Sequence, residues 1–358
     1  MKALLTTVAL ILSIQVNAQN YTPDWESLKE YDTPEWFKDA KFGMWAHWGF
    51  QSNPQAGNWY TRNFYFQDLW QYNFHLQNYG NPKDYGVKEL LRDWKAENWD
   101  PEGIVKLYKS VGAKYFFTLG NFHDNVDLWD SKYQEWNCVN LGPKKDVVGI
   151  WEKAARKEGL PFGVSFHAAH AWTYLEGSRK FDGLLKKEDG VGKWWEGYDP
   201  QKLYVQNHSL SRDGDKSGTI YGQWDWGNGA SQPDAEFKQN FVDRTLDAIE
   251  KYNPDLIYFD DAVLPFYYSD DEPGLEIASK FYNKMYQNGK ILVSCFANNS
   301  IHSSRIVLLG TSNEVFRQPY RNTIGKPVPA WANGSIVRIA TTPMIIRVHN
   351  SLFRCCST

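Results

Sequence analysis

The chain of 358 residues has the length of two average domains or of one large barrel-type domain. Its content of 42% hydrophobic and 23% charged residues excludes a disordered or fibrous protein, and a formal net charge of −3 gives no basic footprint for nucleic acid or anionic lipid. Aromatic residues reach 16%, with 17 Trp, which indicates either flat faces on which sugars stack or a core packed with rings.

The first residues have the pattern of a secretory signal peptide. Lys2 precedes the apolar run 3–14, which is too short for a membrane span, and the small residues at 16–18 suit a cleavage site. We therefore expect residues 1–18 to be removed and the protein to be exported, into a periplasm or out of the cell. No later stretch reaches about 18 apolar residues, so we expect no transmembrane helix.

Strand-like and helix-like segments alternate along the rest of the chain, which predicts parallel βα units. The predicted strands are 41–47, 113–119, 161–165, 255–259 and 290–296. The predicted helices are 104–111, 146–155, 237–249 and 271–289. This order predicts an α/β fold of the (β/α)8-like, TIM-type barrel class.

Polar or ionisable side chains follow four of these strands, which is where a barrel of this class carries its chemistry. They are His47, Asn121, His123, His167, Asp260 and Asp261. The long polar stretches 53–99 and 170–235 are then expected to be loops over that end of the barrel.

Asp260 directly follows an apolar strand, so its carboxylate is a candidate nucleophile, base or metal ligand, or a cap of the next loop. No HxH, HExxH or CxxC spacing occurs, and we expect no metal. The chain also lacks GxxxxGK[ST], GxGxxG after a strand and GxSxG, which argues against a nucleotide site and a serine hydrolase. A carboxylate combined with imidazoles and Trp faces favours a glycosidase.

Several segments, in order over about residues 24–296, resemble the α-L-fucosidases of glycoside hydrolase family 29. The matching segments are 36–49, 58–60, 112–124, 128–133, 142–146 and 254–260. The resemblance implies an exo-acting, retaining double displacement on a terminal α-L-fucose of a glycan or oligosaccharide, without a cofactor. It implies that Asp260 attacks the anomeric carbon. The side chains expected to contact the sugar or line its pocket are His47, Trp59, His123, His167 and Trp172.

The chain departs from the family pattern at three positions. Asn58 stands where many members have Glu, Phe122 replaces the first residue of a His pair, and Asp261 replaces a common Gly. Phe122 removes a hydrogen-bond donor to a sugar hydroxyl. Two alternatives therefore stay open: a retaining glycosidase for a related sugar such as galactose, and a catalytically weak or dead sugar-binding protein on the same scaffold.

Beyond about residue 297 the resemblance weakens, which implies an incomplete C-terminal part of the barrel and a missing β-sandwich domain. Residues 324–334 can be back-translated with codons that, read from the third base of the Ile324 codon, encode Trp-Gln-Thr-Gly-Thr-Cys-Leu-Gly-Lys-Trp. This shifted reading is similar to a family motif at this place. We predict a frameshift near 322–324, with a barrel over 19–323 and an aberrant tail over 324–358; the alternative is a genuinely divergent tail. Glu314, in the last family-like segment, is the predicted acid/base. The sequence gives no oligomeric state.

Overall fold

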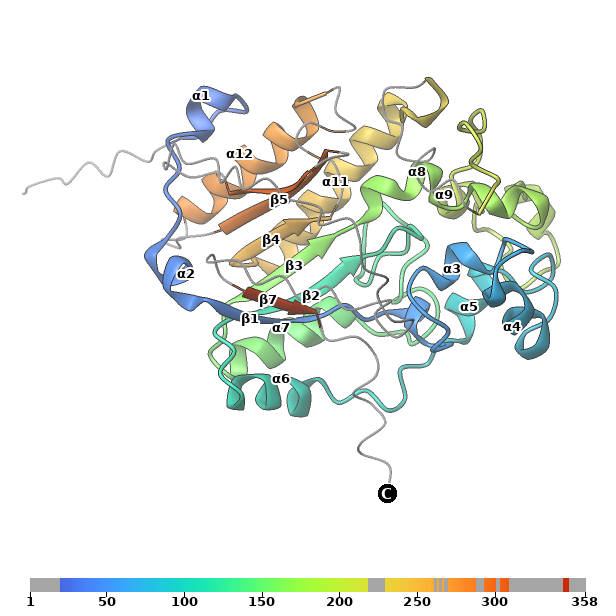
Figure 1. Ribbon diagram of the computed structural model, residues 1–358, viewed down its shortest axis with the longest axis horizontal. Helices are drawn as coiled ribbons and strands as arrows, with labels where there is room; N and C mark the ends of the chain where they lie inside the picture. The colour runs from blue at the N-terminus through green and yellow to red at the C-terminus, as the bar shows by residue number, and fades with distance from the viewer. Residues whose placement is uncertain are drawn as a thin grey trace, which may run out of the picture.

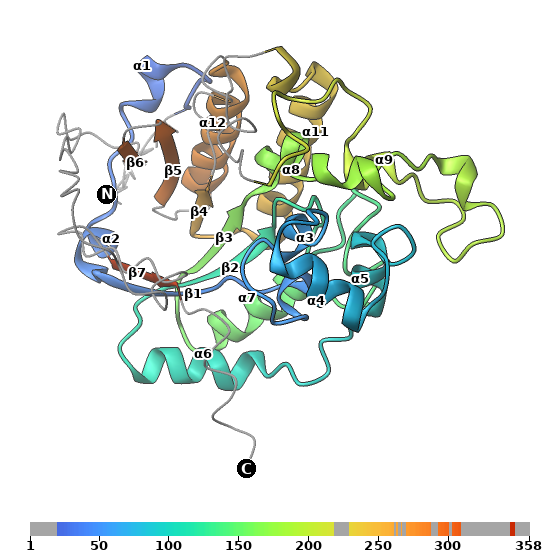
Figure 2. The ribbon, with the colours of Figure 1, turned by 45° about the vertical axis from the view of Figure 1, so that its right-hand side comes forward.

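A curved, mostly parallel sheet forms the centre of the molecule in the computed structural model (Figures 1 and 2). The structure describes residues 20–217, 229–260, 263, 266, 270–287, 293–300, 303–308 and 344–347. Its parallel strands, adjacent in chain order, are β1 (Phe42–Ala46), β2 (Phe116–Asn121), β3 (Phe162–Phe166), β4 (Leu256–Phe259) and β5 (Val293–Ser300). At the ends of the sheet, β7 (Met344–Arg347) pairs parallel with β1, and β6 (Ser303–Leu308) pairs antiparallel with β5.

A helix lies in the connection before each of the strands β2 to β5. These helices are α6 (Pro101–Ser110), α7 (Val147–Lys157), α11 (Ala235–Tyr252) and α12 (Glu272–Gln287). They pack against one another in that order, α6 on α7, α7 on α11 and α11 on α12. Repeated strand–helix units with ordered neighbours are the arrangement of a TIM-type domain, as the sequence predicts. Among the described residues, no helix combines the length and the apolar character needed to span a membrane.

Local signals explain why these helices begin and end where they do. Asp100, Asp146 and Asp234 each precede a helix, and each carboxylate accepts a hydrogen bond from a backbone N–H in the first turn. Helices α6 and α7 are followed by Gly112 and Gly159, whose φ values of +100° and +68° suit glycine. The next strand starts a few residues later, which is why the predicted order of elements is correct.

The sheet differs from a regular barrel at its C-terminal edge. Only two residues separate β5 from β6, whereas a parallel connection needs a crossover of about a dozen residues or more. The antiparallel pairing of β6 follows from this short connection. The strand β7 falls within 324–358, the segment that the sequence analysis assigns to an aberrant tail.

The prediction that 53–99 and 170–235 are loops is wrong in part. The first stretch contains α3 (Tyr60–Asn63), α4 (Trp70–Asn78) and α5 (Val87–Asp93), and the second contains α8 (Ala171–Tyr174) and α9 (Gln201–Tyr204). Two further helices, α1 (Trp25–Leu28) and α2 (Glu35–Ala40), precede β1. Short 3-10 helices occur at Phe50–Ser52, Ala168–His170, Glu176–Lys180, Lys187–Gly190 and Gly229–Ser231.

Tertiary contacts stabilise α4, which has too little apolar periodicity to be found by pattern. His75 of α4 is buried, with Nδ1 2.7 Å from the hydroxyl of Tyr60 and Nε2 2.7 Å from the carbonyl of Tyr85. A carbonyl only accepts, so Nε2–H donates to Tyr85 and Nδ1 accepts from Tyr60. Burial lowers the pKa of His75 to about 4, which keeps this bridging ring neutral.

Much of the aromatic content packs the core. Five tryptophans are among the largest fully buried side chains: Trp94, Trp129, Trp136, Trp151 and Trp195. Trp48 contacts the rings of Trp94 and Trp151 with centroid distances of 5.1 and 6.4 Å. The high Trp count is therefore explained to a considerable degree by packing, and a role in binding has to be argued ring by ring.

Candidate active site

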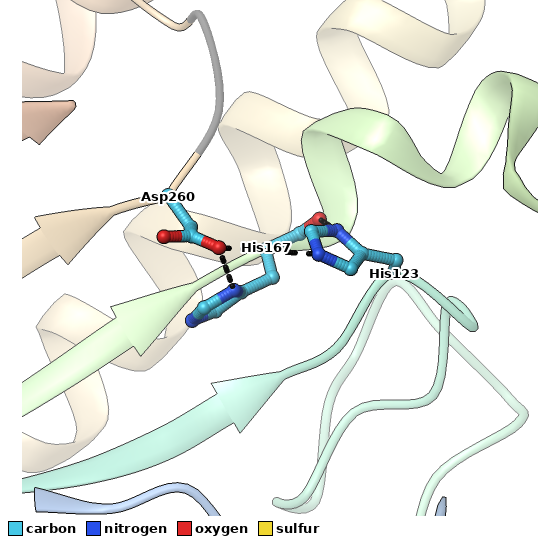
Figure 3. A group of neighbouring side chains, drawn as sticks. All are labelled: His123, His167 and Asp260. Carbon is cyan, nitrogen blue, oxygen red and sulfur yellow. Dashed lines mark hydrogen bonds and ion pairs between the residues drawn. The ribbon is translucent and has the colours of Figure 1, made fainter. Parts of the chain in front are cut away.

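The ends of β2, β3 and β4 bring His123, His167 and Asp260 together (Figure 3). Asp260 is the first residue after β4, and His167 is the first after β3. The Nδ1 atom of His167 lies 3.1 Å from Oδ2 of Asp260, and Nε2 of His123 lies 4.0 Å from the same oxygen. The predicted convergence of polar side chains at the C-terminal ends of the strands is thus present in the structure.

Asp260 is held at both carboxylate oxygens yet keeps access to solvent. The hydroxyl of Tyr258 donates to Oδ1 across 3.0 Å, while Oδ2 faces His167. The Asp260 side chain is 27% exposed, whereas His123 and His167 are buried. Sequence reasoning missed Tyr258, although its position two residues before Asp260 predicts the same face of the strand.

The hydrogen-bond partner of His123 determines which ring nitrogen faces Asp260. Nδ1 of His123 lies 2.9 Å from the carbonyl oxygen of His167, and a carbonyl only accepts. Nδ1 therefore carries a proton, and Nε2 is directed toward Asp260, where it is an acceptor in the neutral form of the ring. A substrate hydroxyl placed between them has an acceptor available at Nε2.

His47 follows β1 and joins this cluster from the neighbouring strand. Its ring centroid lies 5.0 Å from that of His167 and 5.3 Å from that of Phe122. Phe122 is buried and lies 4.6 Å from the ring of His123. An apolar ring therefore occupies the position between two histidines where the family pattern has a third.

Trp59 reaches the cluster from the N-terminal end of α3. Its ring centroid is 5.8 Å from that of His123, 5.8 Å from that of Tyr174 and 6.2 Å from that of His170. The backbone of Trp59 has φ +61°, an unfavourable value for a bulky residue. Such conformations concentrate at functional sites, where the surrounding structure maintains them.

Two residues next to Trp59 escaped the sequence analysis. His170 and Tyr174 are fully buried, and burial lowers the pKa of His170 well below its usual range, so this ring is neutral. The position of His170 three residues after His167 was the available signal. Tyr174 had none, because it follows no strand and belongs to no motif.

Trp172 belongs to a different group of rings. It stacks on His208 with a centroid distance of 4.1 Å, contacts Phe237 at 5.4 Å, and donates its Nε1–H to the carbonyl of Ala230 at 3.0 Å. Its predicted place in the sugar pocket stays a prediction. Glu314 and Asp261 lie outside the described residues.

The same three side chains have a geometry that a cation could use. Each of these residues, His123, His167 and Asp260, offers one potential metal-ligand atom, and the three atoms lie within 4.8 Å of one another. Imidazole nitrogens and a carboxylate oxygen are ligands that Zn²⁺ accepts. The expectation of a site without metal stays a prediction, and it needs a chelation experiment.

Comparisons with known proteins identify the family of this chain. The family model described as "Alpha-L-fucosidase" matches residues 8–322. The tissue alpha-L-fucosidase of Bos taurus is 34% identical over 155 residues, which cover 42% of this chain and 32% of that protein. The plasma alpha-L-fucosidase of Homo sapiens is 31% identical over 163 residues, which cover 44% of this chain and 34% of that protein.

Solved structures of similar fold include the alpha-fucosidase of Thermotoga maritima. It superimposes with a TM-score of 0.53 at 25% identity, covering 76% of this chain and 55% of that one. The same protein in complex with fucose gives a TM-score of 0.51 at 26% identity, covering 74% and 54%. The match thus spans about a third of the curated relatives and just over half of these structures. The predicted α/β, TIM-like fold is confirmed.

Proposed function

The chain belongs to the alpha-L-fucosidase family, and from this we propose that it is an exo-acting glycoside hydrolase that releases terminal α-L-fucose with retention of configuration. The substrate is a fucosylated glycan or oligosaccharide. The observation on which this depends is the Asp260 carboxylate at the end of β4, oriented by His167 and Tyr258 and partly open to solvent.

The reaction proceeds in two displacements. In the first, a carboxylate oxygen of Asp260 forms an ester bond to the anomeric carbon while the bond to the leaving oxygen breaks, and that oxygen takes a proton from a general acid. In the second, the residue that served as the general acid now acts as a base and removes a proton from water. The water oxygen attacks the anomeric carbon, the ester bond to Asp260 breaks, and the Asp260 carboxylate is released. The second carboxyl group should lie about 5–5.5 Å from the first. We propose Glu314 for it.

The surrounding side chains suit the binding of a pyranose ring. The Nε2 atom of His123 accepts from a sugar hydroxyl, and His47 offers a second polar ring beside it. Trp59 supplies an apolar face at the same place. We propose sugar contacts for these three residues, for His167 and, more remotely, for Trp172.

Replacement of Asp260 by Asn tests the nucleophile. We expect kcat on an aryl α-L-fucoside to fall by roughly a thousandfold or more, because the amide cannot form the glycosyl ester. Folding, followed by circular dichroism, should be unchanged. Asp130→Asn is the control, because the Asp130 side chain is 64% exposed and its pair with Lys251 spans 3.6 Å. A folded Asp260→Asn variant with normal kcat would remove Asp260 from this role.

Phe122 supports a second candidate function, a sugar-binding protein with weak or no turnover, or a glycosidase for a related sugar. Its buried ring cannot donate to a substrate hydroxyl. Titration with L-fucose alongside the turnover assay distinguishes a sugar-binding protein from an active hydrolase, since binding without turnover supports the former. A panel of aryl glycosides that includes galactosides tests the second.

Retained turnover after chelation excludes a catalytic cation held by His123, His167 and Asp260.

Export completes the proposal. The pattern of residues 1–18 supports removal of a signal peptide and delivery to a periplasm or the exterior, where extracellular glycans are available. Sequencing the N-terminus of the mature protein tests this. A protein that retains Met1 in the cytoplasm would contradict it.

A further inference from the structure

Asn121, the last residue of β2, links three buried polar groups that the proposed reaction does not use. Its Nδ2–H donates to Oδ1 of Asp127 across 3.0 Å. Its Oδ1 accepts from the backbone N–H groups of His167 at 2.9 Å and Ala168 at 3.1 Å. The orientation of the amide is therefore set by donors on one side and a carboxylate on the other.

Helix α11 holds the far side of this network in place. Arg244 donates to both oxygens of Asp127, with Nη2 2.6 Å from Oδ1 and Nε 3.0 Å from Oδ2, and its Nη1 donates to Oδ1 of Asn125 at 2.5 Å. Asn121, Asp127 and Arg244 are 1%, 0% and 2% exposed. Buried charge-assisted bonds of this kind are strong and geometrically specific.

One peptide group connects this network to the carbonyl that His123 contacts. The N–H of Ala168 and the C=O of His167 belong to one planar unit and point in opposite directions. Asn121 binds that N–H at 3.1 Å, and the C=O accepts from Nδ1 of His123 at 2.9 Å. Fixing the peptide plane at Asn121 therefore fixes the direction of the carbonyl that His123 meets.

Building on the proposed function, we propose that Asn121, supported by Asp127 and Arg244, is a positioning residue that selects the Nδ1–H tautomer of His123. The selected tautomer presents Nε2 as an acceptor to a sugar hydroxyl beside Asp260. Without Asn121, the peptide between His167 and Ala168 is left with the long 3.4 Å bond from the N–H of His170 to its carbonyl, so it can tilt and weaken the contact that defines the tautomer of His123.

Nuclear magnetic resonance of the full chain with ¹⁵N-labelled histidine tests the tautomer directly, because protonated and unprotonated ring nitrogens differ in ¹⁵N chemical shift. The sequence holds eight histidines, and His123→Gln identifies the signals of His123. We expect Nδ1 protonated and Nε2 unprotonated in the wild type. The opposite tautomer, or a proton on both ring nitrogens, in the wild type would overturn the proposal.

Asn121→Ala should shift the His123 signals toward a mixture of tautomers. If the alanine variant does not fold, Asn121→Ser replaces it, because the serine side chain is too short for its oxygen to reach both N–H groups. Asp247→Asn is the matched control, because Asp247 accepts from Nε1 of Trp129 at 2.9 Å and ties the same helix to the same loop without contacting Asn121. Unchanged His123 signals in a folded Asn121 variant, or an equal shift in the control, would overturn the proposal.

Affinity provides the second readout. We expect the Kd for L-fucose to weaken about tenfold in Asn121→Ala, as for the loss of one hydrogen bond, and the Asp247→Asn control to bind normally. If the wild type neither binds nor hydrolyses a fucoside, the proposed function fails while the spectra still test the positioning role. If the wild type is active and the variant keeps both its tautomer and its affinity, the positioning role alone fails.

Discussion

Asp124 lies beside His123 with its side chain fully buried, and the hydroxyl of Thr61 is 3.4 Å from its carboxylate. Burial raises the pKa of Asp124 to about 7, despite hydrogen bonds that act in the opposite direction. The charge of this residue is therefore decided by its surroundings, and its position next to a site histidine in the sequence gives no indication of it.

This pKa has a consequence for stability. The folded protein keeps a proton on Asp124 between about pH 4 and 7 that the unfolded chain has lost, so this group makes the free energy of unfolding fall as the pH rises through that window. Asp124→Asn imitates the neutral acid and should remove the effect. The variant should gain stability relative to wild type by about 1.4 kcal/mol per pH unit up to about pH 7.

Urea denaturation of both proteins at about pH 5 and about pH 8 measures this difference. Buried His170 makes the free energy of unfolding rise with pH in both proteins, and taking the difference between variant and wild type cancels this contribution. A stability difference that is the same at the two pH values would show that Asp124 titrates normally.

At the scale of elements, a buried ion pair connects α5 to the segment that follows α8. Asp182 accepts from Nζ of Lys88 at 2.9 Å and from the hydroxyl of Tyr65 at 2.8 Å, and it also accepts from Tyr204 of α9. All four side chains are buried. A buried acceptor with several donors determines how these elements pack, since another arrangement leaves buried donors without their acceptor.

Removal of this acceptor should destabilise the protein strongly. We expect Asp182→Ala to lower the free energy of unfolding by about 3–5 kcal/mol, because the buried hydroxyls of Tyr65 and Tyr204 lose their acceptor and Lys88 is left with Glu89, 3.0 Å away. Glu26→Ala is the control, because the Glu26 side chain is 88% exposed and its pair with Lys29 should contribute less than about 1 kcal/mol. Comparable shifts of the denaturation midpoint in the two variants would contradict this account.

For the whole molecule, the predicted frameshift concerns the gene and is tested there. The family match ends at residue 322, which supports an in-frame chain up to that region. We expect sequencing to show a one-base insertion or deletion near codons 322–324, with a restored frame that encodes the Trp-Gln-Thr-Gly motif. A gene that encodes residues 324–358 in an intact native frame would refute the prediction.

The local sequence was enough to determine the order of the strands and helices from β1 to β5. Apolar runs, the capping aspartates and Gly112 and Gly159 act within a few residues, so they can be interpreted without the fold. The same holds for the candidate nucleophile Asp260, since a carboxylate after an apolar strand is visible in the sequence. The helices α3 to α5 were missed because contacts from other elements, such as those of His75, stabilise them.

Only the tertiary structure decided how the side chains of the site meet. The contact of His167 with Asp260, the bond from His123 to the His167 carbonyl and the link from Asn121 to Arg244 through Asp127 all join residues from different strands or from a helix more than a hundred positions away. Such distances depend on register and on the twist of the sheet, which no local pattern encodes. The types of residue that do the chemistry were therefore predictable from the sequence, while their hydrogen bonding and protonation became known only from the fold.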